Sequence, residues 1–184
     1  FPWYAYRKED NNFQDENGEP WIQWWCPMDR FVIFPGEIHI SHSMRTLMNK
    51  HRYRVTFNRA FEEVIKHCGD LRKDQEGAWL GAAVTEAYTE LYRQQFACSV
   101  EVWDGDQLVG GLYGVTLGRC FFGESMFSLA PSASKMALIH LAALLKDSGG
   151  IIDCQFETPH LKSMGGRYIS YDEYIKIIQE EEQQ

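Results

Sequence analysis

The chain has 184 residues and a formal net charge of −8, which allows one hydrophobic core or one core with a small appended lobe. Hydrophobic residues make up 45% and charged residues 24%, a composition typical of a globular protein. The acidic balance argues against general binding of nucleic acids. No apolar run approaches the roughly 18 residues of a membrane span, and no signal-like segment opens the chain. We therefore expect a cytoplasmic protein without a membrane partner.

Two further features restrict the chemistry. The chain begins with Phe1 and not with methionine, so we expect a processed or trimmed product that lacks upstream residues. The five cysteines are widely spaced and form no C-x-x-C pair. This pattern argues against a disulfide framework and a zinc site, and it predicts reduced thiols and no bound metal.

Residues 1–57 are expected to form a small N-terminal lobe, incomplete without the upstream residues. A short strand is predicted at 31–34, ending at a Pro-Gly pair. Ser41 or Ser43 is placed to cap a basic helix at 44–50, and alternation predicts another strand at 53–57.

Residues 58–184 are expected to form the main domain. The predicted helices are one capped by Asn58, one at 84–95, one from Ser132 or Ser134 to 147, and one at 171–179 capped by Ser170. The predicted strands are 97–103, 107–117, 120–126 and 151–155, and an Asp-Gly turn at 104–106 joins the first two. This order predicts an α+β fold, in which helices flank a mixed, largely antiparallel sheet, and it resembles an acyltransferase of the GNAT type.

One carboxylate stands within an aromatic stretch. Residues 121–128 (FFGESMFS) place Glu124 among three phenylalanines and a methionine. A glutamate is rarely buried without a partner. The stretch is therefore either a turn that lets Glu124 reach water or the wall of an apolar pocket with one charge aimed inward.

A second polar pair lies in the predicted strand at 151–155. Alternation places Asp153 and Gln155 on one face and Ile152 and Cys154 on the other. An aspartate that fixes the orientation of a glutamine amide suits the binding of an incoming amine, because the amide oxygen accepts a hydrogen bond. The alternative is a structural aspartate at a strand end.

Two enzyme classes fit poorly. Ser125, Asp153 and His160 follow the order of a hydrolase triad, but Phe127 replaces the second glycine of the G-x-S-x-G elbow. A CoA-dependent acetyltransferase carries a [QR]-x-x-G-x-[GA] loop at a helix start. The nearest match is 107–112, where Leu112 breaks the pattern within an expected strand.

Basic residues are concentrated between residues 38 and 60, where no acidic residue occurs. Such a patch on an acidic protein indicates local contact with phosphates. The alternative is a solvated helix face. The candidate phosphate contacts are Arg45, Lys50, Arg52 and Arg54.

Motifs along nearly the whole chain resemble those of the leucyl/phenylalanyl-tRNA–protein transferase family. The most specific are GESMFS at 123–128 and IDCQ at 152–155. The others are FPW at 1–3, WW at 24–25, HIS at 39–41, YRVT at 53–56, Gly77 with Trp79, SVEVW at 99–103, VGGLYGV at 109–115, ASK at 133–135 and residues 160–165.

The resemblance implies a function. It implies transfer of Leu, Phe or Met from aminoacyl-tRNA to proteins that begin with Arg or Lys, which marks them for N-end-rule degradation. It implies a GNAT-like domain beside the small lobe, without CoA or another cofactor, and we expect a monomer. A CoA-dependent N-acetyltransferase and a non-catalytic module that binds tRNA or peptide remain as alternatives.

The resemblance also implies roles for individual residues. Asp153 and Gln155 correspond to the catalytic pair, and Glu124 would attract the cationic residue of the acceptor. The binding walls for the terminal adenosine and the donor side chain would be Trp3, Trp79, Phe121 and Met126. The positions that line the pocket would be Leu112, Leu138, Leu141 and Ile152.

Overall fold

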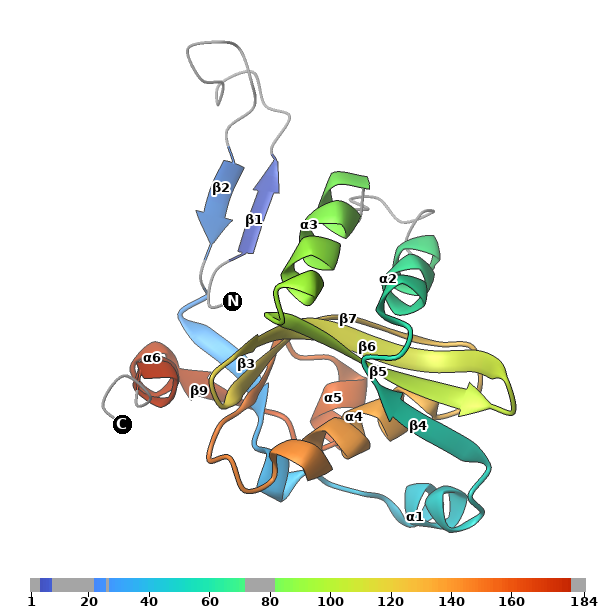
Figure 1. Ribbon diagram of the computed structural model, residues 1–184. Coiled ribbons are helices and arrows are strands. Elements are labelled where there is room, and N and C mark those ends of the chain that lie inside the picture. Colours follow the sequence, from blue (N-terminus) through green and yellow to red (C-terminus); the bar gives the residue numbers. More distant parts are fainter. Residues whose placement is uncertain (1–3, 8–21, 26, 72–81, 180–184) are drawn as a thin grey trace.

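The computed structural model describes residues 4–7, 22–25, 27–71 and 82–179 (Figure 1). Its strands are β1 (Tyr4–Arg7), β2 (Ile22–Trp25), β3 (Asp29–Ile33), β4 (Tyr53–Phe57), β5 (Ala97–Asp104), β6 (Gln107–Leu117), β7 (Cys120–Ser128), β8 (Ile152–Gln155) and β9 (Arg167–Ser170). Its helices are α1 (His42–Asn49), α2 (Phe61–Asp70), α3 (Ala82–Arg93), α4 (Ala133–Leu145), α5 (Pro159–Ser163) and α6 (Tyr171–Gln179), with a 3-10 turn η1 at Pro35–Glu37.

Seven of these strands form one sheet in the order β4-β5-β6-β7-β8-β3-β9. Strands β7 and β8 are parallel, and every other neighbouring pair in this sheet is antiparallel. The prediction of a mixed, largely antiparallel sheet flanked by helices is confirmed. Strand β3, from the first 57 residues, lies between β8 and β9, so the sheet crosses the division expected at residue 57. The described strands of those residues that lie outside this sheet, β1 and β2, pair with each other.

Helices cover both faces of the sheet, and the two faces have different cores (Figure 1). Helix α4 lies on one face, where Met136, Leu138 and Leu141 join a large apolar cluster with β5, β6, β7 and β8. On the opposite face, α2 and α3 cover β5 to β7, and α6 packs beside β3 and β9. Within the described part of the chain, no helix is long and apolar enough to cross a bilayer.

The helix caps confirm two sequence predictions and correct another. Ser41 caps α1 by accepting a hydrogen bond from the main-chain N–H of Met44, and Ser170 accepts from Glu173 at the start of α6. Asn58 does not cap α2, which begins at Phe61. Asn58 has a left-handed backbone, with φ of 55°, and its side chain accepts from the main chain of Ser99. The Asn58 side chain is therefore used in a tertiary contact with β5 and not as the helix cap.

Candidate active site

The candidate site lies where the parallel strands β7 and β8 separate. Their register contains two pairs, Phe121 with Ile152 and Phe122 with Asp153. Beyond these pairs the Gln155 side chain spans the gap, because its Nε2 donates to the carbonyl oxygen of Gly123 at 3.4 Å. A side chain therefore replaces main-chain pairing at this point of the sheet.

Glu124 occupies a β-bulge on β7. Tyr113 of β6 lies opposite Ser125 and Gly114 lies opposite Gly123, which leaves Glu124 without a partner on β6. Bulges are frequent next to active sites, where they change the direction of a side chain. Gly114 permits the bulge, because a Cβ atom there would lie 2.1 Å from the carbonyl oxygen of Phe122. Glu124 is therefore a residue of the strand, and the turn interpretation was wrong.

The predicted apolar pocket residues lie in one cluster on the α4 face of the sheet. Phe121, Leu112, Leu138, Leu141 and Ile152 are buried there, and the partly buried Met126 packs against them. Strict alternation would place Phe121 and Met126 on opposite faces of β7. The bulge between them shifts the alternation by one residue, so both point toward α4.

Glu124 is held on the opposite side by Tyr88 of α3, whose hydroxyl hydrogen-bonds its carboxylate. Burial raises the pKa of Glu124, and the hydrogen bond from Tyr88 partly opposes this effect. Burial also raises the pKa of the Tyr88 hydroxyl, with the Glu124 charge as the next cause. Burial therefore disfavours the charged form of this carboxyl group relative to its protonated form.

Asp153 is completely buried, and three donors of the protein bind its carboxylate. Oδ2 accepts from Arg30 Nη2 at 2.5 Å and from the Tyr174 hydroxyl at 2.6 Å. Oδ1 accepts from the main-chain N–H of Gln155 at 2.8 Å. From the sequence we predicted that Asp153 would hold the side-chain amide of Gln155. The structure corrects this: Asp153 holds the main chain of Gln155, and the amide binds Gly123.

Sequence reasoning missed Arg30 and Tyr174. Arg30 precedes the predicted strand by one residue, and Tyr174 is one of several aromatic residues near the C-terminus. Asp153 itself indicated that such partners exist, since a carboxylate in a buried strand requires a cationic or hydrogen-bonding partner. The sequence did not indicate which residue would supply it.

Two other kinds of catalysis, by a cysteine nucleophile and by a serine hydrolase triad, do not fit the residues around Asp153 and Gln155. Burial, followed by the charge of Asp153, raises the pKa of the Cys154 thiol, so Cys154 is not a thiolate nucleophile. The carboxylate of Asp153 binds Arg30 and Tyr174 and not His160. A Ser125–His160–Asp153 relay is therefore not formed, in agreement with the argument from the elbow motif.

The four predicted phosphate contacts are exposed and lie on α1, the loop after it and β4. Arg52 binds Asp104 at 2.6 Å, while the Arg54 guanidinium lies 5.2 Å from the centre of the Trp103 ring. Strand β4 is four positions from β8 in the sheet. At about 4.8 Å per position, this edge is roughly 19 Å from Asp153.

Trp3 and Trp79, the other two predicted wall residues, lie outside the described residues. Among the residues that are described, no group of three or more His, Cys, Asp or Glu could hold a metal ion. The four described cysteines, Cys68, Cys98, Cys120 and Cys154, are free thiols.

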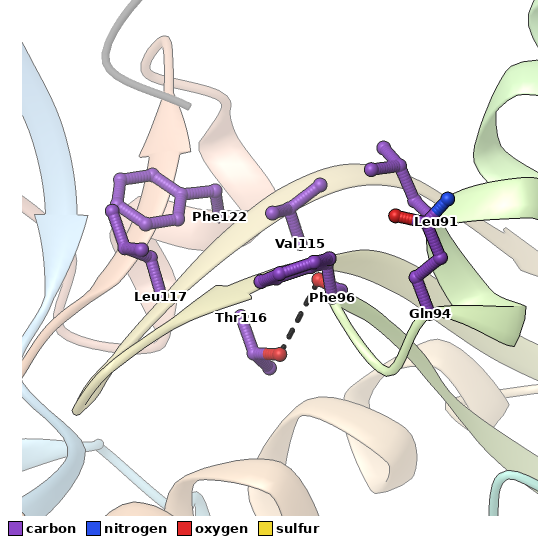
Figure 2. Close-up of a pocket in the computed structure, with 7 residues that line it drawn as sticks. All are labelled: Leu91, Gln94, Phe96, Val115, Thr116, Leu117 and Phe122. Carbon is purple, nitrogen blue, oxygen red and sulfur yellow. Dashed lines mark hydrogen bonds between the residues drawn. The ribbon is translucent and has the colours of Figure 1, made fainter.

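An apolar pocket of about 290 Å³ lies between the end of α3 and strands β6 and β7 (Figure 2). It is lined by Leu91, Gln94, Phe96, Val115, Thr116, Leu117 and Phe122. The Thr116 hydroxyl donates to the carbonyl oxygen of Phe96 at 3.3 Å, which ties β6 to the segment after α3. Phe122, which lines this pocket, is the register partner of Asp153 on β8.

The described fold and site define an α/β protein with a mixed sheet, whose polar centre lies at a divergence of two parallel strands. A crystal structure of a conserved protein of unknown function from Bacteroides thetaiotaomicron VPI-5482 has a similar fold, with a TM-score of 0.53 and 12% sequence identity. The similarity covers 88% of this chain and 56% of the other, and it concerns the fold alone.

Sequence comparison shows the family. The family model for leucyl/phenylalanyl-tRNA protein transferase matches residues 32–179. The leucyl/phenylalanyl-tRNA–protein transferase of Pseudomonas fluorescens (strain Pf0-1) is 48% identical over 97% of this chain and 74% of its own length. That of Flavobacterium psychrophilum is 44% identical over 97% of this chain and 80% of its own length. The chain belongs to the leucyl/phenylalanyl-tRNA protein transferase family.

Proposed function

We propose that the protein is an aminoacyltransferase that moves leucine, phenylalanine or methionine from aminoacyl-tRNA to the α-amino group of an acceptor protein. Family membership over residues 32–179 is the observation that carries this proposal. The site supports it, since β7 and β8 diverge beside a polar strand end, with an apolar cluster on the α4 face and the half-buried Glu124 carboxylate on the opposite face. A GNAT-like acyltransferase arrangement is part of the proposal.

In the proposed reaction, the neutral acceptor amine attacks the ester carbonyl that joins the amino acid to the 3′-terminal ribose of the tRNA. A C–N bond forms, the C–O ester bond breaks, and the ribose hydroxyl leaves with a proton. An α-amino group has a pKa of about 7.7–8.0, so part of it is neutral at pH 7 without a strong base. The protein then contributes mainly by positioning the two substrates.

Gln155 is the proposed contact to the acceptor amine. Its Nε2 donates to Gly123, which turns Oε1 away from that carbonyl and leaves it to accept from an N–H group. Asp153 has no exposed surface and acts on the reaction through Gln155. In this geometry Asp153 is a positioning residue of the proposed pair, and Gln155 is the member that meets the substrate.

The apolar cluster beside α4 is proposed to hold the donor side chain, with Phe121, Met126, Leu112, Leu138, Leu141 and Ile152 as its wall. One methylene in such a pocket changes binding by about 1–3 kcal/mol, so leucine, phenylalanine and methionine should all be accepted. Trp3 and Trp79 are proposed to bind the terminal adenosine. Glu124 is proposed to favour an acceptor that begins with Arg or Lys, because its charge is poorly hydrated.

The basic residues of α1 and β4 are proposed to bind phosphates of the acceptor stem. Strand β4 lies roughly 19 Å from Asp153 across the sheet, and this separation supports contact with phosphates several nucleotides from the reacting 3′ end. Modification of an N-terminal Arg or Lys with leucine or phenylalanine would create a degradation signal in the N-end-rule pathway.

The direct test is transfer of labelled leucine from Leu-tRNA to a peptide that begins with Arg. We expect label in this peptide and little in the matched peptide that begins with Ala, and we expect Phe-tRNA to serve as a donor and Ile-tRNA to serve poorly. Acetyl-CoA with the same peptide is the control for an acetyltransferase. Absence of label from every aminoacyl-tRNA would overturn the proposal.

A further inference from the structure

Three buried side chains from distant parts of the chain meet behind Gln155. Arg30 of β3, Asp153 of β8 and Tyr174 of α6 each have 0% exposed surface. The Arg30 guanidinium and the Tyr174 hydroxyl both donate to Asp153 Oδ2, and the guanidinium also lies 5.1 Å from the centre of the Tyr174 ring. This trio lies on the sheet face opposite the apolar cluster, because Asp153 pairs in register with Phe122 of the α6-side core.

Stability alone gives no reason for such a trio. Burying two charges costs hydration free energy that their attraction often fails to recover, and well-packed apolar residues are frequently as stable. The other core residues around Tyr174, such as Val32, Phe122 and Ile169, are apolar. A charged trio in this surrounding therefore indicates a task for the carboxylate that an apolar side chain could not perform.

That task is visible at Gln155, which has a left-handed backbone with φ of 65°. Residues other than glycine seldom adopt this conformation and are strained by it. Asp153 Oδ1 offsets the strain by accepting the Gln155 N–H two residues along, as in an Asx turn. The left-handed conformation ends β8 and directs the Gln155 side chain across the gap to Gly123.

We propose that Arg30 and Tyr174 are positioning residues for acyl transfer, which fix Asp153 so that it holds Gln155 in its left-handed conformation. The two donors occupy Oδ2 and thereby set the rotation of the carboxylate, which aims Oδ1 at the Gln155 N–H. This inference rests on the proposed function insofar as Gln155 meets the acceptor amine. The statement that Arg30 and Tyr174 fix the conformation of Gln155 through Asp153 holds without any substrate.

The first test measures hydrogen exchange of the Gln155 main-chain amide by NMR in the substrate-free protein. Tyr174→Phe removes one hydroxyl and keeps the ring. We expect the Gln155 amide to exchange about tenfold faster in this variant, the effect of losing one charge-assisted hydrogen bond. The Val102 amide in β5 should be unchanged, which separates a local effect from general loosening. Tyr168→Phe is the matched control, because Tyr168 is 52% exposed.

The second test separates positioning from binding in the transfer assay. We expect Tyr174→Phe to lower kcat about tenfold, with KM for Leu-tRNA within twofold of the unchanged protein, because the donor pocket and the phosphate contacts lie elsewhere. Arg30→Lys, which keeps the charge and loses the planar fork, should lower kcat in the same direction. Tyr168→Phe should leave both parameters unchanged.

The outcomes distinguish this inference from the proposed function. An unchanged Gln155 exchange rate in Tyr174→Phe would overturn the inference, whatever the enzyme activity. Faster exchange with an unchanged kcat would also overturn it, since the conformation would then not matter for the reaction. If the unaltered protein transferred no amino acid, the proposed function would fail, while the exchange measurement would still decide whether the trio fixes Gln155.

Discussion

Phe121 and Met126 point to the same side of the sheet, although they are five residues apart on one strand. An odd separation would normally place them on opposite faces. The bulged residue Glu124 lies between them and shifts the alternation by one position. The same bulge turns Glu124 toward Tyr88 on the other face. One irregularity thus supplies the apolar wall and the charge of the candidate site together.

Gly114→Ala should disrupt this arrangement. The added methyl group would meet the Phe122 carbonyl oxygen at 2.1 Å and the Phe121 ring at 2.6 Å, and the backbone cannot move aside without losing the bulge. We expect a loss of about 3 kcal/mol in the free energy of unfolding, measured by chemical denaturation. Gly36→Ala is the control, because its methyl group would meet only the Lys146 carbonyl oxygen, at 3.8 Å. Equal stability of the two variants would contradict the assignment.

Removal of the Glu124 charge should stabilise the protein at neutral pH and not at acidic pH. The pKa of this carboxyl is raised by burial, so the folded state binds its proton more tightly than the unfolded state does. Stability from this group is therefore present at low pH and is lost as the pH rises through the folded pKa. Glu124→Gln should have a higher Tm than the unchanged protein at pH 7 to 8, and the difference should shrink toward pH 4.5.

The control for this experiment is Glu86→Gln, which neutralises an exposed carboxylate on α3, the helix that carries Tyr88. Its Tm, measured at the same pH values, is the reference for removal of a carboxylate charge from the surface. In the transfer assay, Glu124→Gln should reduce the preference for a peptide that begins with Arg over one that begins with Ala. A preference that survives unchanged would show that another group recognises the acceptor.

The buried pair Arg30–Asp153 should respond to mutation unlike the exposed pair Arg52–Asp104. Arg30→Met leaves a buried carboxylate without its cation, and we expect destabilisation of about 3–5 kcal/mol. Addition of Asp153→Asn in the same chain should recover part of this loss, because the uncompensated charge is removed. Arg52→Met should cost about 0–1 kcal/mol, since its side chain is 55% exposed. Urea denaturation of the four proteins measures these differences.

Neutralisation of Asp104 should strengthen tRNA binding. Asp104 binds Arg52 at 2.6 Å and competes with a phosphate for it. We expect Asp104→Asn to bind Leu-tRNA about threefold more tightly at low salt. The salt dependence of log K should steepen by about 0.7–0.9, the value for one added phosphate contact. Asp106→Asn makes the same charge change on an exposed residue of the same turn, and a similar gain there would indicate a general charge effect.

Local periodicity in the sequence predicted most strands of the sheet and most of the helices that cover it. The hairpin of β5 and β6 matched its prediction because the Asp-Gly turn fixes the register, and Gly105 has the expected positive φ of 61°. Asn58 was mistaken for a helix cap because its side chain has two possible main-chain partners, and tertiary pairing with Ser99 decided between them.

The details of the site depend on contacts that periodicity does not encode. A bulge is one extra residue in one strand, so it appears only when the partner strand is known. The pairing of Arg30 with Asp153 joins residues 123 positions apart, and the chain contains other arginines. A carboxylate in a buried strand needs partners, and the order of the strands in the sheet determined which ones Asp153 has.

The central place of β3 in the sheet has a consequence for synthesis on the ribosome. Asp153 is synthesised 123 residues after Arg30, a delay of roughly 6–25 s at bacterial elongation rates. During this time the apolar strand β3 has neither of its neighbours, β8 and β9, and its unpaired edge could associate with other chains. Nascent chains should therefore be inactive until the last helix has emerged, and their yield should depend on chaperones that shield this strand.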